Sequence, residues 1–444
     1  MIMKIFSIYF ISYAFCILYH NNVFAQQLQT IKNETIKMDL NIRHTTDTSK
    51  TDSLLVHLLE NNPIYFDSIL KHRRQWNVQF IYTQIDRGAN GIPALKNYYF
   101  NVDSQQYFYP ASTIKLPVCL LALQKLNELK ATGITANTTM ITEAQDNLPP
   151  TYNDPTTKDG KPTIANYIKK ILMVSDNDAY NRLYEFLGRG YINEQLHKKG
   201  YSDAQILHRL NTVLSPEQNR TTNPINFYDE KNKLIYSQPM QYDSTCYALR
   251  KDSIEKGYYS NEKLIDSSMN FSTKNKMSLQ NLHNILLSLM IPEKVTEDQR
   301  FNITDKDRNF VLKYMSKLPT ESKWPPYASD SVNYWPGFGK FLLYGAEKKE
   351  LPKNIRIFNK EGDAYGQLTD IAYVVDFDKK IEFFLSATIY CNEDGILNDD
   401  KYDYDTIGLP FLKHLGEVIY EYETRRPKKI LPDLTPLLFN YNAE

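Results

Sequence analysis

Residues 109–129 read YPASTIKLPVCLLALQKLNEL, and this stretch carries most of the information about the fold and the site. The apolar residues that follow Ser112 predict a long buried helix that begins at this serine. Pro117 is compatible with such a helix because it lies near the first turn, where most backbone N–H groups have no helical partner. Lys115 follows Ser112 by three residues, so the hydroxyl and the amine share one helical face.

The pair formed by Ser112 and Lys115 has the chemistry of an activated nucleophile. A serine hydroxyl attacks poorly unless a base accepts its proton. Burial near a second cation lowers the pKa of a lysine, so that its neutral amine can act as that base. The N-terminus of the helix adds backbone N–H groups that suit a developing oxyanion.

The pattern Ser-x-x-Lys is weak evidence when it is taken alone. It occurs again at residues 253–256 and 260–263, and a serine before a helix often serves only as an N-cap. The pair at Ser112 and Lys115 differs in its context, because the strongly apolar helix that follows would bury the lysine. The N-cap remains the alternative interpretation of Ser112.

A second motif, Ser175-Asp176-Asn177, interrupts a helical stretch at residues 164–187. The functional interpretation gives Ser175 a proton-transfer role beside Lys115 and gives Asn177 a hydrogen bond to the substrate. The alternative is structural, because Asp176 can cap the helix that continues to the end of this stretch.

A third motif, Lys360-Glu361-Gly362, follows the strand-like residues 355–359. A cation at Lys360 could hold a substrate carboxylate and lower the pKa of Lys115. Gly362 would let a ligand approach the backbone closely at the strand edge. Taken alone, the same residues also fit an exposed turn with ordinary charges.

Together the three motifs resemble the signature of class A β-lactamases and penicillin-binding proteins, in which Ser-x-x-Lys, Ser-Asp-Asn and Lys-Thr-Gly occur in this order. The resemblance covers roughly residues 53–423. It implies an α/β fold of the α+β type with a five-stranded antiparallel sheet flanked by helices, and an all-helical lobe at about residues 116–350. An expected insertion at residues 215–275 helps to absorb the long spacing before the third motif.

The resemblance also implies a role for each motif residue. Ser112 would be acylated by a β-lactam or a D-alanyl peptide, and Lys115 would accept its proton. Ser175 would relay that proton to the leaving nitrogen. Lys360 would face the substrate carboxylate, and the backbone N–H groups of Ser112 and Asp363 would form the oxyanion hole.

Two departures from the family pattern affect the expected activity. Glu361 stands where the family has Thr or Ser, so a negative charge lies near the expected docking point of a substrate carboxylate. The Glu-x-x-Leu-Asn loop that supplies the deacylating base of class A enzymes has no clean copy, and residues 210–220 offer only Glu217. A solvated loop carboxylate is the alternative interpretation of Glu217. Without such a base the acyl-enzyme would persist.

Hydrophobic periodicity predicts the remaining elements of a domain at residues 53–424. The expected strands are residues 78–86, 97–102, 355–360, 371–377 and 381–390, and the expected helices include residues 53–74 (interrupted at Pro63), 279–290, 305–318 and 409–422. Strands near both ends of a chain can pair into one sheet, with the middle forming a separate lobe. The cleft between two such lobes is a natural ligand site.

Composition excludes several other classes of function. Lys+Arg and Asp+Glu are both 52, so the basic excess of a nucleic-acid binder is missing. The histidines have no paired spacing and no Cys-x-x-Cys occurs, so we expect no metal and no other cofactor. Cys119, Cys246 and Cys391 allow one disulfide at most. The expected partner is a small-molecule substrate, either a β-lactam or a cell-wall peptide.

The N-terminal residues 1–25 have the features of a signal peptide. Lys4 precedes an apolar run that is shorter than the ~20 residues a membrane-spanning helix needs, and cleavage is expected after Ala25. An uncleaved anchor is the alternative. We expect a flexible leader at residues 26–52, a C-terminal tail at residues 425–444, no stable membrane span after cleavage, and a periplasmic or secreted protein.

Three functions follow from these observations. The first is a β-lactamase-like serine hydrolase that opens β-lactam amides through a Ser112 acyl-enzyme. The second is a D-alanyl-D-alanine carboxypeptidase or another cell-wall amide or ester hydrolase, favoured by the missing deacylation base. The third is a non-catalytic periplasmic binding protein of the same fold, favoured by Glu361 but opposed by the retention of both Ser112 and Lys115.

Overall fold

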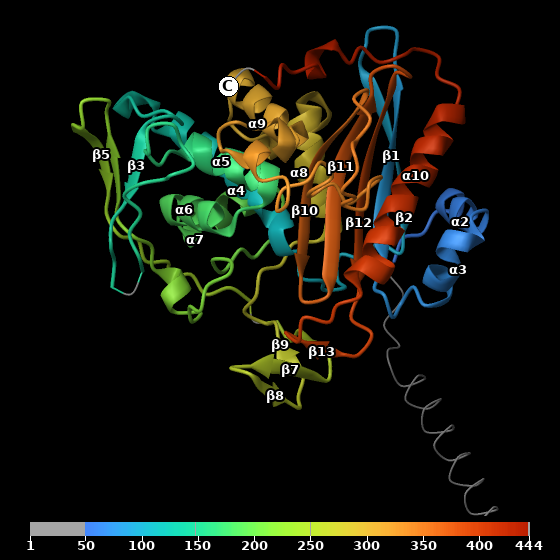
Figure 1. Cartoon of the computed structure of the whole chain (residues 1–444), viewed down its shortest axis with the longest axis horizontal. Helices are drawn as coiled ribbons and strands as arrows, with labels where there is room; N and C mark the ends of the chain where they lie inside the picture. The colour runs from blue at the N-terminus through green and yellow to red at the C-terminus, as the bar shows by residue number, and fades with distance from the viewer. Residues whose placement is uncertain (1–48, 147, 249, 443–444) are drawn as a thin grey trace, which may run out of the picture. The chain divides into compact units, whose positions relative to one another are not determined.

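The structure is a computed structural model that describes residues 49–442 apart from residues 147 and 249 (Figure 1). The predicted signal peptide and most of the predicted leader therefore lie outside the described residues. None of the helices in the described part of the chain combines the length and the apolar character that a membrane span requires. Cys119 and Cys391 are buried, Cys246 is exposed, and all three are free thiols.

A five-stranded antiparallel sheet forms the centre of the described part. In spatial order its strands are β10 (Ile355–Ala364), β11 (Gln367–Asp376), β12 (Ile381–Tyr390), β1 (Gln79–Arg87) and β2 (Pro93–Phe100). The early and late strands meet at β1, where Tyr82 lies opposite Leu385 of β12 and Tyr98 of β2. This sheet, flanked by helices as Figure 1 shows, confirms the mixed fold class that the sequence predicts.

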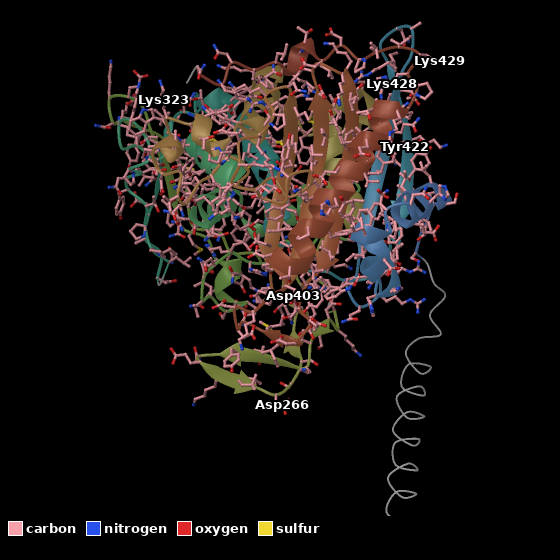
Figure 2. The ribbon with its side chains drawn as sticks, turned by 45° about the vertical axis from the view of Figure 1, so that its right-hand side comes forward. Asp266, Lys323, Asp403, Tyr422, Lys428 and Lys429 are labelled. Carbon is pink, nitrogen blue, oxygen red and sulfur yellow. The ribbon has the colours of Figure 1, made fainter. Side chains whose placement is uncertain are left out.

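Helices cover both faces of the sheet. Alternate residues of β1 point to opposite faces, so Phe80 and Tyr82 join one apolar core while Ile81 and Ile85 join the other. The first face packs against α2 (Ser53–Glu60), α3 (Pro63–Lys71) and α10 (Leu409–Arg425), and the second against α8 (Leu279–Met290) and α9 (Asp305–Ser316). Figure 2 marks Tyr422 on α10, whose ring meets that of Tyr82 edge-on.

The second lobe is built around α4 (Lys115–Glu128), whose residues 115–126 are all buried. Its other elements are α5 (Ile164–Val174), α6 (Asn177–Leu187), α7 (Arg189–Lys198) and the antiparallel strands β3 (Thr139–Thr142), β4 (Ile225–Tyr228) and β5 (Leu234–Gln238). Met140 and Phe227 of this small sheet join the same apolar core as the helices. The sequence predicts an all-helical lobe, and this prediction is wrong because the lobe also contains these three strands.

The predicted insertion, residues 215–275, supplies β4, β5 and four further strands. These are β6 (Ser253–Ile254), β7 (Gly257–Ser260), β8 (Lys263–Ile265) and β9 (Met269–Asn270), and β7 also pairs with β13 (Ile396–Leu397). Because β13 belongs to the segment before α10, this small sheet connects the insertion to the C-terminal part. Tyr109, Phe271 and Leu397 share one apolar cluster, which places the insertion beside the residues that precede Ser112.

Candidate active site

Ser112 lies in a tight 3₁₀ turn, Ala111–Ile114, immediately before α4. The carbonyl of Pro110 fixes this turn, because it accepts hydrogen bonds from the backbone N–H of Thr113 at 3.1 Å and from its hydroxyl at 2.5 Å. Ala111 has a φ of 45°, in the left-handed region that side chains disfavour, and such strain often marks a functional site. The turn leaves Ser112 partly exposed between buried neighbours.

Lys115 is fully buried, and the second motif holds its amine. Nζ donates hydrogen bonds to the Ser175 carbonyl, to Asn177 Oδ1 at 2.7 Å and, at 3.4 Å, to Ser175 Oγ. The motif can reach the amine because Ser175 ends α5 with a φ of 58°, while Asp176 caps α6 by accepting a hydrogen bond from the Ala179 N–H. Asp176 is thus the helix cap, whereas Ser175 and Asn177 face the lysine.

The protonation of Lys115 is set mainly by its burial. Burial, and second the positive charge of Lys360, lower the pKa of Lys115 to about 7. A neutral amine has two N–H bonds and one lone pair, and the Ser175 carbonyl and Asn177 Oδ1 can engage both N–H groups. The lone pair then remains to accept a proton. Within the described structure no hydrogen bond joins Nζ to Ser112 Oγ, and catalytic hydrogen bonds often tighten only when a substrate binds.

The acylation rate is expected to depend on pH through Lys115. The neutral amine is the active base, and its fraction rises as the pH increases through about 7. Acylation should rise by ~10-fold per pH unit below that value and level off above it. Pre-steady-state rates over a pH series test this, and Glu361→Gln should move the midpoint down because the Glu361 carboxylate raises the pKa of Lys115. A rate that falls with increasing pH would contradict this role.

Lys360 of β10 completes the hydrogen-bonded group. Its buried amine donates three hydrogen bonds of 2.9 Å each, to Ser175 Oγ, to the Glu361 carbonyl and to Glu361 Oε1. An ammonium group has three N–H donors, so all three are used within the protein. Because Ser175 Oγ accepts from Lys360, the hydroxyl proton of Ser175 can point toward Lys115 or a leaving group.

Gly362 brings strand β10 against the turn that carries Ser112. A Cβ at this position would lie 2.7 Å from the Ser112 nitrogen and 2.9 Å from the Thr113 nitrogen. The sequence suggested that Gly362 admits a ligand to the strand edge. The structure shows instead that the close neighbour is the protein's own backbone. Gly362 therefore sets the distance between the nucleophile and the next strand residue, Asp363.

Gly362→Ala is expected to slow acylation by roughly 10²-fold, the typical cost of displacing reacting groups by about 1 Å. The added methyl group would push β10 away from the Ser112 turn, because backbone atoms cannot yield as a flexible side chain can. Acylation rates with one activated ester, measured alongside thermal unfolding, separate this local effect from a loss of the fold. A rate within ~2-fold of the wild type would show that the close approach is not required.

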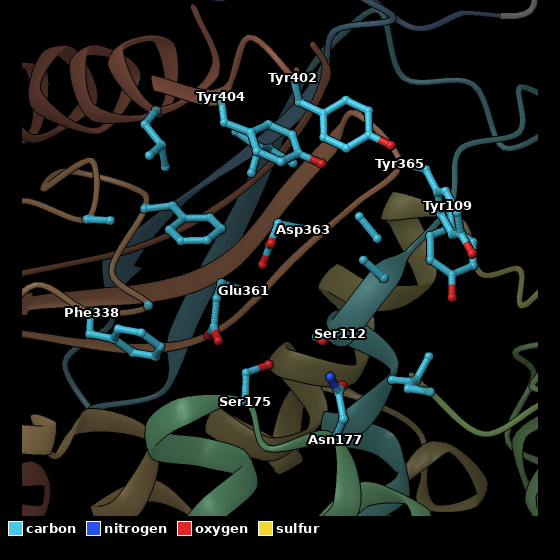
Figure 3. A pocket seen from close by; sticks show the side chains of 18 of the residues that line it. Tyr109, Ser112, Ser175, Asn177, Phe338, Glu361, Asp363, Tyr365, Tyr402 and Tyr404 are labelled. Carbon is cyan, nitrogen blue, oxygen red and sulfur yellow. The ribbon is translucent and has the colours of Figure 1, made fainter. Parts of the chain in front are cut away.

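Ser112, Ser175 and Asn177 border a cavity of about 710 Å³. Figure 3 shows Glu361 and Asp363 extending from their strand into the same space. The rest of the wall includes Tyr109, Leu210, Asn211, Trp335, Phe338, Tyr365, Asp400, Tyr402, Tyr404 and Asp405. The structure thus brings the three predicted motifs together at one accessible hollow.

The structure does not bring Glu217 to this cavity. Its side chain is 68% exposed, it accepts a hydrogen bond from the Tyr242 hydroxyl at 2.7 Å, and it pairs with Arg220 at 3.1 Å. The same loop lines the cavity earlier in its course, through Leu210 and Asn211. Glu217 is therefore a solvated loop carboxylate, and the residue of this loop that brings a polar side chain to the cavity wall is Asn211, an amide.

The sequence prediction missed the contribution of residues 398–405. This segment reads NDDKYDYD and brings Asp400, Tyr402, Tyr404 and Asp405 to the cavity wall. Its density of Asp and Tyr just before the last helix is a signal that could have pointed to it. Across the described ranges, no group of three or more His, Cys, Asp or Glu side chains is placed to hold a metal ion.

Comparison with known proteins gives one family and several distant structures. A model described as the Beta-lactamase enzyme family matches residues 66–420. Curated protein sequences give no match. A class A β-lactamase from Clostridium kluyveri DSM 555 is 13% identical, with 81% of this chain and 98% of that chain covered and a TM-score of 0.46. The structure of PBP-A is 16% identical, with 85% of this chain and 98% of that chain covered and a TM-score of 0.46. A β-lactamase from Sphaerobacter thermophilus DSM 20745 is 10% identical, with 84% of this chain and 98% of that chain covered and a TM-score of 0.45.

Proposed function

Because the chain belongs to the Beta-lactamase enzyme family, we propose that it is a serine hydrolase that forms an acyl-enzyme on Ser112. The observation that supports this most is the buried amine of Lys115, held by Ser175 and Asn177 one helical turn from the Ser112 hydroxyl. A buried amine with a pKa of about 7 is a suitable base at neutral pH. A non-catalytic protein would have no physical reason to maintain it.

Acylation would proceed by proton transfers within this group. Ser112 Oγ attacks the carbonyl carbon of a β-lactam or an acyl-D-alanine peptide, and its proton passes to Lys115. The negative charge on the carbonyl oxygen is met by the backbone N–H groups of Ser112 and Asp363. When the C–N bond breaks, Ser175 gives its proton to the leaving nitrogen and regains one from Lys115. Lys360 keeps the Ser175 hydroxyl in place by donating a hydrogen bond to its oxygen.

Deacylation is the slower step in this proposal. Water must lose a proton as it attacks the ester, and an amide side chain such as that of Asn211 cannot accept it. Glu217, the candidate base from the sequence, lies outside the cavity lining. This favours a cell-wall amide or ester hydrolase, the class that includes D-alanyl-D-alanine carboxypeptidases, over an efficient β-lactamase. We also propose that the protein acts outside the cytoplasm, on the evidence of the predicted signal peptide.

Time courses of bond cleavage test this function. The purified protein is mixed with an excess of a penicillin or, separately, of an acyl-D-alanyl-D-alanine peptide, and ring-opened penicillin or D-alanine is measured. We expect a burst of one cleaved bond per active site, since the opened penicillin remains on Ser112 whereas D-alanine leaves, followed by a slower linear phase for the penicillin. Glu217→Gln should leave that slow phase unchanged. Product formation no faster than in buffer, for both substrate classes, would refute the proposal.

A further inference from the structure

Lys360 and Glu361 form a buried ion pair, so the positive charge of Lys360 is compensated by a carboxylate of the protein itself. The Lys360 side chain is fully buried and that of Glu361 is 7% exposed, and their charged atoms lie 2.9 Å apart. All three N–H groups of Lys360 already have acceptors, one of which is the Glu361 carboxylate. A substrate carboxylate would find no unused donor on this cation. Glu361 therefore occupies the role that an anionic group of the substrate would otherwise fill.

The wall of the cavity is acidic. Its described lining residues include four carboxylates, those of Glu361, Asp363, Asp400 and Asp405, and no lysine, arginine or histidine. Asp363, Asp400 and Asp405 are exposed, and within the described structure none of the three has an ion-pair partner. Like charges facing an incoming carboxylate oppose its binding, whereas an ammonium group would be attracted.

Aromatic rings stand next to these carboxylates. Tyr402 and Tyr404 lie with ring centroids 5.2 Å apart, and both line the cavity on the side that Figure 3 shows above Asp363. Tyr365 lines the same space, and the nearby cation of Lys274 lies 5.7 Å from its ring centroid but does not line the cavity. Tyrosine faces attract organic cations as carboxylates do, so both features favour the same charge.

We propose that the cavity prefers acyl donors that carry a positively charged amino group and reacts slowly with those that have a carboxylate beside the scissile bond, such as penicillins and acyl-D-alanyl-D-alanine peptides, with Glu361 as the specificity-determining residue. This inference rests on the proposed acylation of Ser112 and names the substrate class for it. Glu361 excludes an anion by pairing with Lys360, while Asp363, Asp400 and Asp405 supply the field that draws in a cation.

Three activated esters test this selectivity. They share one acyl group and one leaving-group scaffold, and carry an ammonium, a methyl or a carboxylate substituent near the ester. The second-order acylation rate is measured for each. We expect the ammonium ester to react fastest and the carboxylate ester slowest, with steps of ~10-fold that shrink as salt is added.

Matched variants connect the selectivity to particular residues. Glu361→Gln keeps an oxygen that can accept from Lys360 but removes the charge, so the ratio of carboxylate-ester to methyl-ester rates should rise by ~10-fold. Asp405→Asn changes an exposed side chain and should lower the ratio of ammonium-ester to methyl-ester rates. Glu393→Gln removes an exposed carboxylate outside the cavity lining and should change neither ratio. Thermal unfolding confirms that each variant is folded.

The outcomes separate this inference from the proposed function. A wild-type protein that reacts with the methyl ester but prefers the carboxylate ester overturns the selectivity and leaves the acylation of Ser112 standing. The same holds if Glu361→Gln has wild-type rate ratios. If none of the three esters acylates the protein, the proposed function fails and this inference fails with it.

Discussion

Replacing Lys115 with methionine is expected to slow the acylation of Ser112 by ~10²–10⁴-fold, the usual contribution of a positioned general base. Methionine has a similar length and fills the buried space, but it cannot accept a proton. Ser175 cannot substitute for the amine, because its hydroxyl is neutral and its oxygen already accepts from Lys360. The rate is measured as the appearance of acyl-protein in the first turnover, at a pH above 7.

Lys125→Met is the matched control for this prediction. Lys125 also lies on α4, is buried, and donates to the Phe186 carbonyl and Gln238 Oε1, but it does not line the cavity. Burial lowers the pKa of Lys125 to about 8, so both substitutions remove a buried amine of similar character. We expect Lys125→Met to acylate within ~2-fold of the wild type. Equal losses in the two variants would show that Lys115 acts only through the fold.

Much of the central sheet could be predicted because its strands are long and regular. The strand at residues 381–390 was predicted with the bounds that β12 has in the structure, since its apolar residues alternate over ten positions. β3, β4 and β5 were not predicted. Strands of four or five residues have too few positions for a period to show, and β3 pairs with a strand, β4, that lies far along the chain.

The three motifs could be placed at one site because each has a recognisable chemistry. The ion pair between Lys360 and Glu361 could not be foreseen, because neighbouring residues of a strand normally point to opposite faces. Only the three-dimensional path of the edge strand shows that the two charged groups meet. The position of Glu217 could not be predicted either, because a loop without hydrophobic periodicity gives no signal for which of its residues lines the cavity.

Ser112→Ala is expected to abolish covalent acylation, with a loss of roughly 10⁶-fold as for other serine nucleophiles. Every other group at the site acts through this oxygen. Lys115 takes its proton, Ser175 protonates the leaving group, and Gly362 sets the distance between β10 and the turn that carries Ser112. The substitution removes one oxygen from a partly exposed side chain, so the fold should remain and thermal unfolding should change little.

The most direct test is the intact mass of the protein after incubation with an excess of a penicillin, with the Ser112→Ala variant in parallel. The wild-type protein should gain the mass of one penicillin, and digestion should place that mass on the peptide that contains Ser112. The variant should gain nothing. An adduct of equal amount on the variant, or a folded wild-type protein that stays unmodified by every acylating reagent, would contradict the account.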